Sequence, residues 1–335
     1  MGKPTLIWFL AGLLGLPGAA RQPAPALVIC HAGSLGAAFK AVGELYTRQT
    51  GIPVTELTGG SVDLARQLAS GKLSCDLYAS ADFEVIDRML KPAGLAGGSL
   101  RFAAGAMVLA YSTDSRNAAT IATPGGPWAP PDAVPMAAPD WWAQLTQAGV
   151  RIAGSHPFLD PGGYRADLIF QLAQAHYQVA NLYNDLLGHY TIGGPVGGLG
   201  KSFDYQFTYE HSALAAFRAD TTGTYRYVRL PDPVSLGAPG LNSLYGRVGI
   251  TIPGLQTAGA PATVHLPAGR VTWGITLLKA APNREHALAF LELLLGSQGT
   301  AILRSLGPAP LSPAQVSRED LASLPASLKA LVQAP

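Results

Sequence analysis

The chain has 335 residues, of which 48% are hydrophobic and only 13% are charged, which is enough apolar material for one large or two medium-sized domains. Lysine and arginine number 23, and aspartate and glutamate number 21, so the formal net charge is only +2. This balance gives no basic footprint for nucleic acid, and the apolar content excludes a largely disordered chain.

Residues 1–20 have the layout of a secretory signal peptide. Lys3 precedes an apolar run over residues 6–16, and small residues close the segment at 18–20. The run is too short and too often interrupted by glycine and proline for a membrane span, although an uncleaved anchor is the alternative. We therefore expect an exported protein, in the periplasm or on the extracellular face of the membrane.

From residue 27 the chain alternates strand-like and helix-like segments, which is the pattern of a parallel sheet with crossover helices. Glycine ends the first two helices, and apolar residues recur on one face of each of them. The predicted strands are 26–32, 52–58 and 75–82, and the predicted helices are 33–51, 59–71 and 83–92. Three such units in succession predict a doubly wound lobe.

Cys30 and Cys75 both lie in strand-like apolar segments of this lobe. Export permits a disulfide between them, but two buried thiols are an equally good interpretation. The sequence leaves the choice open.

After residue 100 the pattern changes. The apolar run 100–112 is long for one strand and could cross to a second lobe, and the Pro/Ala-rich stretch 122–139 indicates a surface insertion. A second series of α/β elements and a helical end of the chain follow. We predict a first lobe made of residues 26–103 and 241–335 and a second lobe made of residues 104–240.

Hydroxyl side chains follow the first three predicted strands. Ligands of open α/β sheets gather there, where helix N-termini present free N–H groups. Ser34, Ser61 and Ser80 stand at these corners, near small residues such as Gly33 and Gly60 that let a ligand approach the backbone. Each serine could instead cap its helix. Their shared position indicates an anion pocket.

Two carboxylates stand at the corresponding corners of the second lobe. Asp160 precedes Pro-Gly-Gly and then Tyr164 in a first helical turn, and Glu210 stands where a strand becomes a helix. Taken singly, Asp160 could be a helix cap and Glu210 an ordinary first-turn acid. Beside the serines, however, two carboxylates would repel an oxyanion. They would therefore bind either a cation or the central atom of the anion.

At these residues the sequence resembles the tungstate- and molybdate-binding proteins of ABC importers. The similarity covers nearly all of the chain after the leader, and its most specific pieces are DPGGYR at 160–165 and YEHS at 209–212. It implies two doubly wound α/β lobes joined by crossing hinge strands, the type II periplasmic-binding-protein fold, which close on the ligand. It also implies a monomer without enzymatic activity or cofactor, whose partner is a membrane permease.

The resemblance assigns oxygen-binding roles to Ser34 and Ser61, and it assigns two ligands of a six-coordinate metal centre to Asp160 and Glu210. Molybdenum(VI) and tungsten(VI) can accept two extra oxygen atoms, whereas sulfur and phosphorus do not readily do so, and this difference would select against sulfate. Gly162 departs from the pattern, because many members have cysteine there. The rest of the expected oxyanion site is Ser80, Gly33, Gly60 and Tyr164.

Two other functions could use the same corners. An exported carrier of a divalent or ferric cation would combine Asp160 and Glu210 with His31, His156 and His211. A hydrolase would use the carboxylates as an acid and base pair, although the sequence offers no activated nucleophile beside them. We favour the oxyanion carrier, without a preference between tungstate and molybdate.

Overall fold

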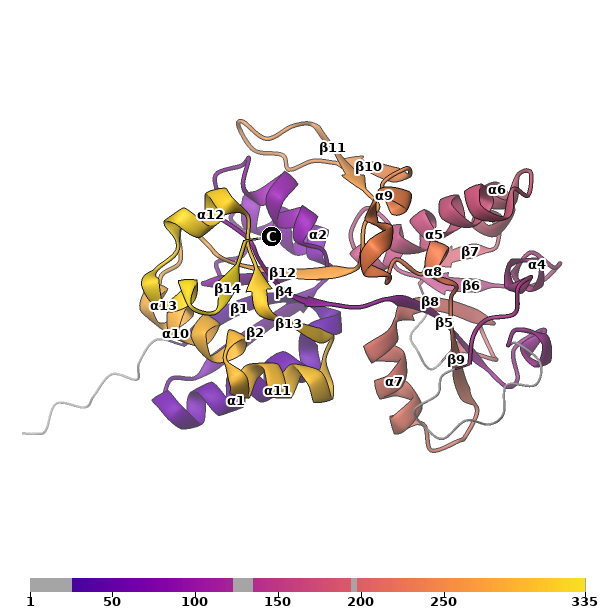
Figure 1. Ribbon diagram of the computed structural model, residues 1–335, viewed down its shortest axis with the longest axis horizontal. Helices are drawn as coiled ribbons and strands as arrows, with labels where there is room; N and C mark the ends of the chain where they lie inside the picture. Colours follow the sequence, from indigo (N-terminus) through magenta and orange to yellow (C-terminus); the bar gives the residue numbers. More distant parts are fainter. Residues whose placement is uncertain (1–25, 123–134, 194–197, 335) are drawn as a thin grey trace, which may run out of the picture.

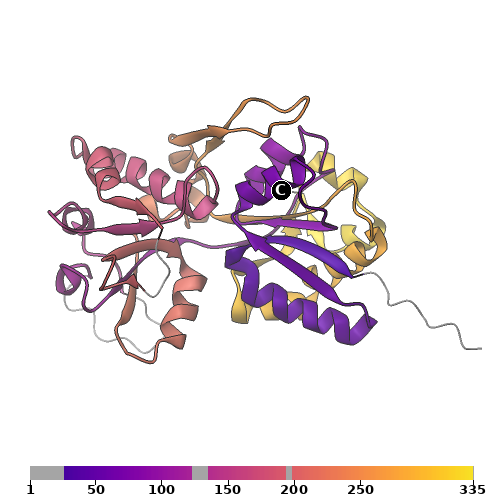
Figure 2. The same cartoon turned by 180° about the vertical axis from the view of Figure 1, so that it is seen from behind.

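The protein forms two α/β lobes, each built on its own sheet (Figure 1). This computed structural model describes residues 26–122, 135–193 and 198–334. The predicted signal peptide and most of the Pro/Ala-rich stretch therefore lie outside the described residues. Figure 2 shows the same two lobes from behind, with helices packed on the faces of both sheets. The predicted two-lobe α/β fold is confirmed.

The first lobe has a seven-stranded sheet of order β14-β13-β4-β12-β3-β1-β2. Strand β1 pairs in parallel with β2 and β3, as the alternation of strands and helices predicts, whereas β12 pairs antiparallel with β3 and β4. The strands are β1 (Leu27–Ala32), β2 (Val54–Gly59), β3 (Leu77–Ser80), β4 (Leu100–Ala104), β12 (Thr272–Leu277), β13 (Ala309–Gln315) and β14 (Val332–Gln333).

The helices of this lobe largely follow the predicted pattern. Helix α1 buries Phe39, Val42 and Tyr46, and it ends at Gly51, whose φ of 73° glycine adopts without a steric penalty. The helix predicted at 83–92 is instead a short α-turn followed by a π-helical turn at Ile86–Leu90. The helices are α1 (Gly36–Thr50), α2 (Ser61–Ala69), α3 (Phe83–Val85), α10 (Arg284–Leu295), α11 (Ser297–Leu306), α12 (Arg318–Ser323) and α13 (Ala326–Lys329).

Cys30 and Cys75 form a disulfide, with their Cα atoms 6.0 Å apart. Both residues are buried, and they meet because Cys30 lies in β1 and Cys75 just precedes β3, the neighbouring strand. The bond closes a loop of 45 residues, a constraint on the unfolded chain that stabilises the fold by about 4 kcal/mol if the effect is one of chain entropy.

The second lobe has a five-stranded sheet of order β7-β6-β8-β5-β9. Trp141 packs edge-on against Phe207, and Phe170 packs against the same ring, so aromatic side chains fill the space between helices and sheet. Its elements are β5 (Met107–Ser112), α4 (Trp141–Leu145), β6 (Ile152–Gly154), α5 (Pro161–Tyr177), α6 (Leu182–Gly188), β7 (Tyr190–Ile192), β8 (Tyr205–Tyr209), α7 (Glu210–Ala219) and β9 (Tyr225–Arg229).

The chain crosses between the lobes twice. The run 100–112 divides at Gly105 into β4 of the first sheet and β5 of the second, as predicted. The return passes through α8 (Asp232–Ser235), α9 (Asn242–Tyr245) and a hairpin of β10 (Gly249–Pro253) and β11 (Thr263–Pro267). This hairpin, which the sequence did not predict, arches over the space between the lobes at the top of Figure 1.

Among the described residues, no single helix is long and apolar enough to span a membrane. Helices α10 and α11 meet that criterion only as a pair, and they are bent by 65° where they join.

Candidate functional site

The N-termini of α2 and α5, one from each lobe, meet between the lobes. The Asp63 N–H donates to the Leu159 carbonyl at 3.1 Å. A Cβ added to Gly60 would stand 2.5 Å from the Leu159 oxygen and 3.3 Å from the Asp160 Cβ, so only glycine allows this approach. Asp160 therefore lies in front of the α2 N-terminus, where the helix dipole favours negative charge.

An arginine reinforces this contact between the lobes. Arg66 of α2 donates to the Phe158 carbonyl and to the Pro253 carbonyl, each at 2.7 Å. One guanidinium group thus joins the first lobe to the loop before α5 and to the β10–β11 hairpin.

Asp160 caps α5. Its Oδ1 accepts from the Gly162 N–H at 2.7 Å, which confirms the capping role that the sequence offered. Burial raises the pKa of Asp160, and this effect is opposed by the N–H groups of Gly162 and Gly163 and by the charge of Arg165. A carboxylate with a raised pKa is poorly stabilised in its ionised form, so a metal centre at this position would favour ionisation.

Gly162 stands where many members of the resembled family have cysteine. A Cβ at this position would lie 2.8 Å from the capping oxygen of Asp160. A side chain there would therefore move the carboxylate, and glycine leaves it in place.

The three serines do not cap their helices. Helices α1 and α2 have no side-chain hydrogen bond at their N-caps, and the cap of α3 is Asp82. The capping interpretation of the serines is therefore wrong. Each serine oxygen instead accepts an N–H at 3.0 Å: Ser34 from Trp273 Nε1, Ser61 from Ala81 N and Ser80 from Asp82 N. A hydroxyl that accepts one bond can still donate its own hydrogen. Ser34 is partly exposed, whereas Ser61 and Ser80 are buried beside the Tyr78 side chain, so a ligand can reach their hydroxyls only after a local rearrangement.

A buried arginine that the sequence did not single out as a site residue links the lobes beside these serines. Arg165 is 2% exposed, and its Nη1 donates to the Ala81 carbonyl at 2.8 Å and to the Tyr209 hydroxyl at 2.9 Å. Its Nη2 lies 3.4 Å from Asp82 Oδ2. The Tyr164 hydroxyl, predicted to face the oxyanion, donates to the same Asp82 oxygen at 2.7 Å. The only signal in the sequence was the position of Arg165 one turn after Asp160.

Aromatic side chains form the wall next to Ser34. The Tyr209 and Trp273 rings lie 4.9 Å apart, and the His211 ring lies 5.2 Å from Trp273. His211 Nε2 is 2.8 Å from the Ser34 carbonyl, which can only accept, so Nε2 carries the proton. Burial lowers the pKa of His211, which favours the neutral ring. This wall therefore ties the second lobe to the start of α1 without adding charge.

Glu210 has different neighbours from Asp160. It is the first residue of α7, as the sequence allowed, and its carboxylate accepts from Arg229 Nε at 2.5 Å. It lines a cavity of about 320 Å³ in which Asp160 takes no part. The structure thus brings Asp160 to the α2 corner, where Ser61 stands, and pairs Glu210 with an arginine.

The histidines of the predicted cation site are dispersed. His31 is buried, with Nε2 2.9 Å from the Glu56 carboxylate, whereas the His156 Nδ1 accepts from the Phe158 N–H at 3.1 Å. Within residues 26–122, 135–193 and 198–334, no group of three or more His, Cys, Asp or Glu side chains is arranged to hold a metal ion. The ligand set expected for a cation carrier is not assembled in this arrangement.

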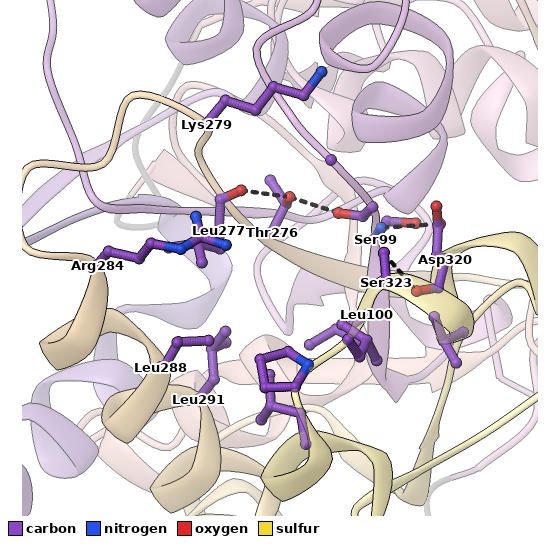
Figure 3. A pocket seen from close by; sticks show the side chains of 16 residues that line it. Ser99, Leu100, Thr276, Leu277, Lys279, Arg284, Leu288, Leu291, Asp320 and Ser323 are labelled. Carbon is purple, nitrogen blue, oxygen red and sulfur yellow. Dashed lines mark hydrogen bonds between the residues drawn. The ribbon is translucent and has the colours of Figure 1, made fainter.

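A further cavity, of about 290 Å³, lies in the first lobe away from the serines. Figure 3 shows Arg284 and Leu288 of α10 on one side and Ser99 and Asp320 on the other. The Asp320 carboxylate accepts from Lys91 Nζ and is therefore already paired. None of the predicted site residues lines this cavity.

Comparison with known proteins connects the chain to carriers of solutes. A family model described as bacterial extracellular solute-binding protein matches residues 27–307. An uncharacterized solute-binding protein of Methanoculleus marisnigri is 26% identical over 92% of this chain and 86% of its own length. The molybdate/tungstate-binding protein WtpA of Pyrococcus abyssi is 26% identical over 93% of this chain and 91% of its own.

Solved structures share the fold at low sequence identity. The sulfate-binding protein SubI from Mycobacterium tuberculosis has a TM-score of 0.55 at 15% identity, covering 86% of this chain and 88% of its own. The periplasmic molybdate-binding protein of Azotobacter vinelandii has a TM-score of 0.53 at 16% identity, covering 84% and 98%. Iron-bound HitA from Pseudomonas aeruginosa has a TM-score of 0.51 at 17% identity, covering 85% and 86%. Because these proteins are named for different ligands, the shared fold alone does not identify the ligand.

Proposed function

The chain belongs to the bacterial extracellular solute-binding proteins, and we propose that it captures tungstate or molybdate between its lobes and delivers it to an ABC importer. The observation that carries this proposal is the position of Asp160, a partly buried carboxylate in front of the α2 N-terminus, where Ser61 begins the helix. Sulfate or phosphate would meet electrostatic repulsion there. A tungsten or molybdenum centre can instead accept the carboxylate oxygen as a ligand.

In the proposed complex, Ser34 and Ser61 donate their hydroxyl hydrogens to oxygens of the anion, and the N-terminus of α2 adds the positive end of its dipole. Asp160 binds the metal centre. The similarity to the Pyrococcus abyssi protein supports this ligand class. Glu210 remains a predicted second ligand, and it would have to leave Arg229 to reach the metal.

The same proposal includes the location of the protein and its partner. Residues 1–20 would direct export and be removed, so that the carrier works in the periplasm or on the outer face of the membrane. It would act as a monomer, without a catalytic role, and pass its ligand to a membrane permease.

The decisive experiment is calorimetric titration of the chain without residues 1–20. We expect one-to-one binding of tungstate or molybdate and poor competition by sulfate and phosphate at matched concentration. The same protein is dialysed separately against zinc and ferric iron and analysed for metal. Tight sulfate binding would contradict the coordination argument, and retention of iron or zinc without oxyanion binding would favour the cation carrier.

Removing the hydroxyl of Ser34 or Ser61 by alanine substitution should weaken tungstate binding by about 1–3 kcal/mol, or roughly tenfold to a hundredfold. Each change leaves a desolvated oxygen of the ligand without a donor. Each also takes an acceptor from Trp273 or Ala81, so a loss of about 1 kcal/mol in unfolding free energy is expected as well.

Titration and urea unfolding of the same variants separate the two effects. If unfolding free energy falls while tungstate affinity stays unchanged, the serines have only a structural role.

A further inference from the structure

We infer that the cavity beside Glu210 is a second ligand site, which binds a small polycarboxylate and holds the two lobes together. The cavity, of about 320 Å³, lies between α7 and β9 of the second lobe and the junction of α11 and β13 of the first, next to the crossing strand at Gly105. Figure 1 shows α7 and α11 facing each other below the crossing strands. Ser61 and Asp160 do not line it.

The cavity has an excess of positive charge. Arg218, Arg229 and Arg304 line it, and Glu210 is the one carboxylate among its described lining residues. Glu210 is already paired with Arg229, so two positive charges are left over. In the part of the chain that the structure describes, no carboxylate lies within ion-pair distance of Arg218 or Arg304. Their guanidinium groups are therefore available to an anion.

Stabilisation of helix ends explains part of this clustering of arginines. Arg218 is in the last turn of α7 and Arg304 in the last turn of α11, where a positive charge complements the helix dipole. The dipole accounts for a basic residue at each helix end. It does not account for the convergence of both, with Arg229, on one cavity between two lobes.

The shape and chemistry of the lining define the class of ligand. A guanidinium group binds a carboxylate through two parallel N–H donors, and the two unpaired groups, from different elements, suit a molecule with at least two carboxylates. The volume is at the lower end for small-molecule sites, which span roughly 300–1,000 Å³. Leu214 and Tyr227 add apolar surface for a short carbon skeleton.

The position of the arginines predicts coupling. Arg304 belongs to the first lobe, whereas Arg218 and Arg229 belong to the second. A ligand that pairs with Arg304 of the first lobe and Arg218 of the second binds better when the lobes are together, and it thereby favours that arrangement. Coupling between two sites is reciprocal, so the polycarboxylate should raise the affinity for the oxyanion. This coupling rests on the proposed function, whereas the site itself does not.

The site is tested by calorimetric titration with tricarballylate, which has three carboxylates and no hydroxyl that could chelate tungstate. The titration uses low-salt buffer without oxyanion. We expect saturable one-to-one binding that Arg218→Gln and Arg304→Gln each weaken about tenfold, because each loses a charge-assisted hydrogen-bond pair. Arg48→Gln is the matched control, since Arg48 is exposed and occupies the last turn of α1. It should bind like the wild type.

Absence of saturable binding overturns the site, as does equal weakening by Arg48→Gln, which would reduce the effect to overall charge. The coupling is tested by titrating tungstate with tricarballylate bound. Affinity should rise about fivefold or more in the wild type and stay unchanged in Arg304→Gln. An unchanged wild-type affinity overturns the coupling. Failure to bind tungstate at all would overturn the proposed function and leave the first titration valid.

Discussion

Replacing Asp160 by asparagine should weaken tungstate binding at least about a hundredfold while leaving the stability of the ligand-free protein nearly unchanged. Loss of a group that only supports a metal ligand typically costs tenfold to a hundredfold in metal affinity, so loss of a direct ligand should cost no less. Asparagine caps a helix about as well as aspartate, so α5 should keep its first turn. Titration and urea unfolding of the variant provide the two measurements.

The pH dependence follows from the direction of the pKa shift at Asp160. Burial raises its folded pKa above the unfolded value, so its contribution to stability is fully present below the unfolded pKa and is lost as pH rises through the folded pKa. Asp160→Asn should remove this dependence, and at neutral pH it should not destabilise the ligand-free protein.

Tungstate affinity should have the opposite dependence on pH, because a metal ligand must be ionised and protons compete with the metal. Wild-type affinity should therefore fall as pH decreases through the raised pKa of Asp160, and the asparagine variant should lose this sensitivity. Titration of the wild type and of Asp160→Asn with tungstate at a series of decreasing pH values gives this comparison. Stronger binding at acid pH would mean that a protonated carboxyl donates to the anion, contrary to the proposal.

Replacing Glu210 by glutamine tests whether this second carboxylate also binds the metal, by comparison with Asp160→Asn. Because its carboxylate is paired with Arg229, we expect a much smaller loss of tungstate affinity than for Asp160→Asn. A loss of the same size would return Glu210 to the metal ligands and require the ion pair to open on binding.

A Gly60→Ala variant should bind tungstate about tenfold to a hundredfold more weakly, because its lobes cannot meet at α2. Its Cβ would stand 2.5 Å from the Leu159 carbonyl oxygen, a backbone atom that cannot rotate away. Separation there would also break the bonds from Asp63 to Leu159 and from Arg66 to Phe158. Two hydrogen bonds lost at about 1 kcal/mol each cost about 2 kcal/mol, which corresponds to a loss of affinity within this range.

Gly188→Ala is the matched control, because Gly188 ends α6 and a methyl group added there would meet no described neighbouring atom within 4 Å. Small-angle scattering with and without tungstate would report whether the lobes close. Wild-type affinity together with normal compaction in Gly60→Ala would show that this contact is not part of the ligand-bound state.

Much of the fold could be predicted because its signals are local. The apolar face of α1 and the glycine at its end need no knowledge of the partner elements. The crossing between the lobes was predictable because the run 100–112 is too long for one strand. Strand β13 could not be recognised, since Pro310 and Pro313 cannot donate to a sheet and rarely occur inside one.

The candidate site likewise has features that the sequence predicts and features that it does not. Ser61 and Asp160 could be located because strand and helix boundaries set their positions. The hydrogen-bond partners of Ser61 and Ser34 could not be predicted, because Ala81 and Trp273 come from other parts of the chain and are brought to the serines only by packing. The cap role of the serines failed for a local reason, because the residue at the cap of α2 is Gly60.

The order of strands in the first sheet bears on how the chain folds as it is made. Strand β12 lies between β3 and β4. The first sheet therefore lacks one of its central strands until residue 277 has been synthesised. All five strands of the second sheet are present once Arg229 has emerged. Since domains generally fold as units during synthesis, the second lobe should become structured first, while β1 to β4 wait for the end of the chain.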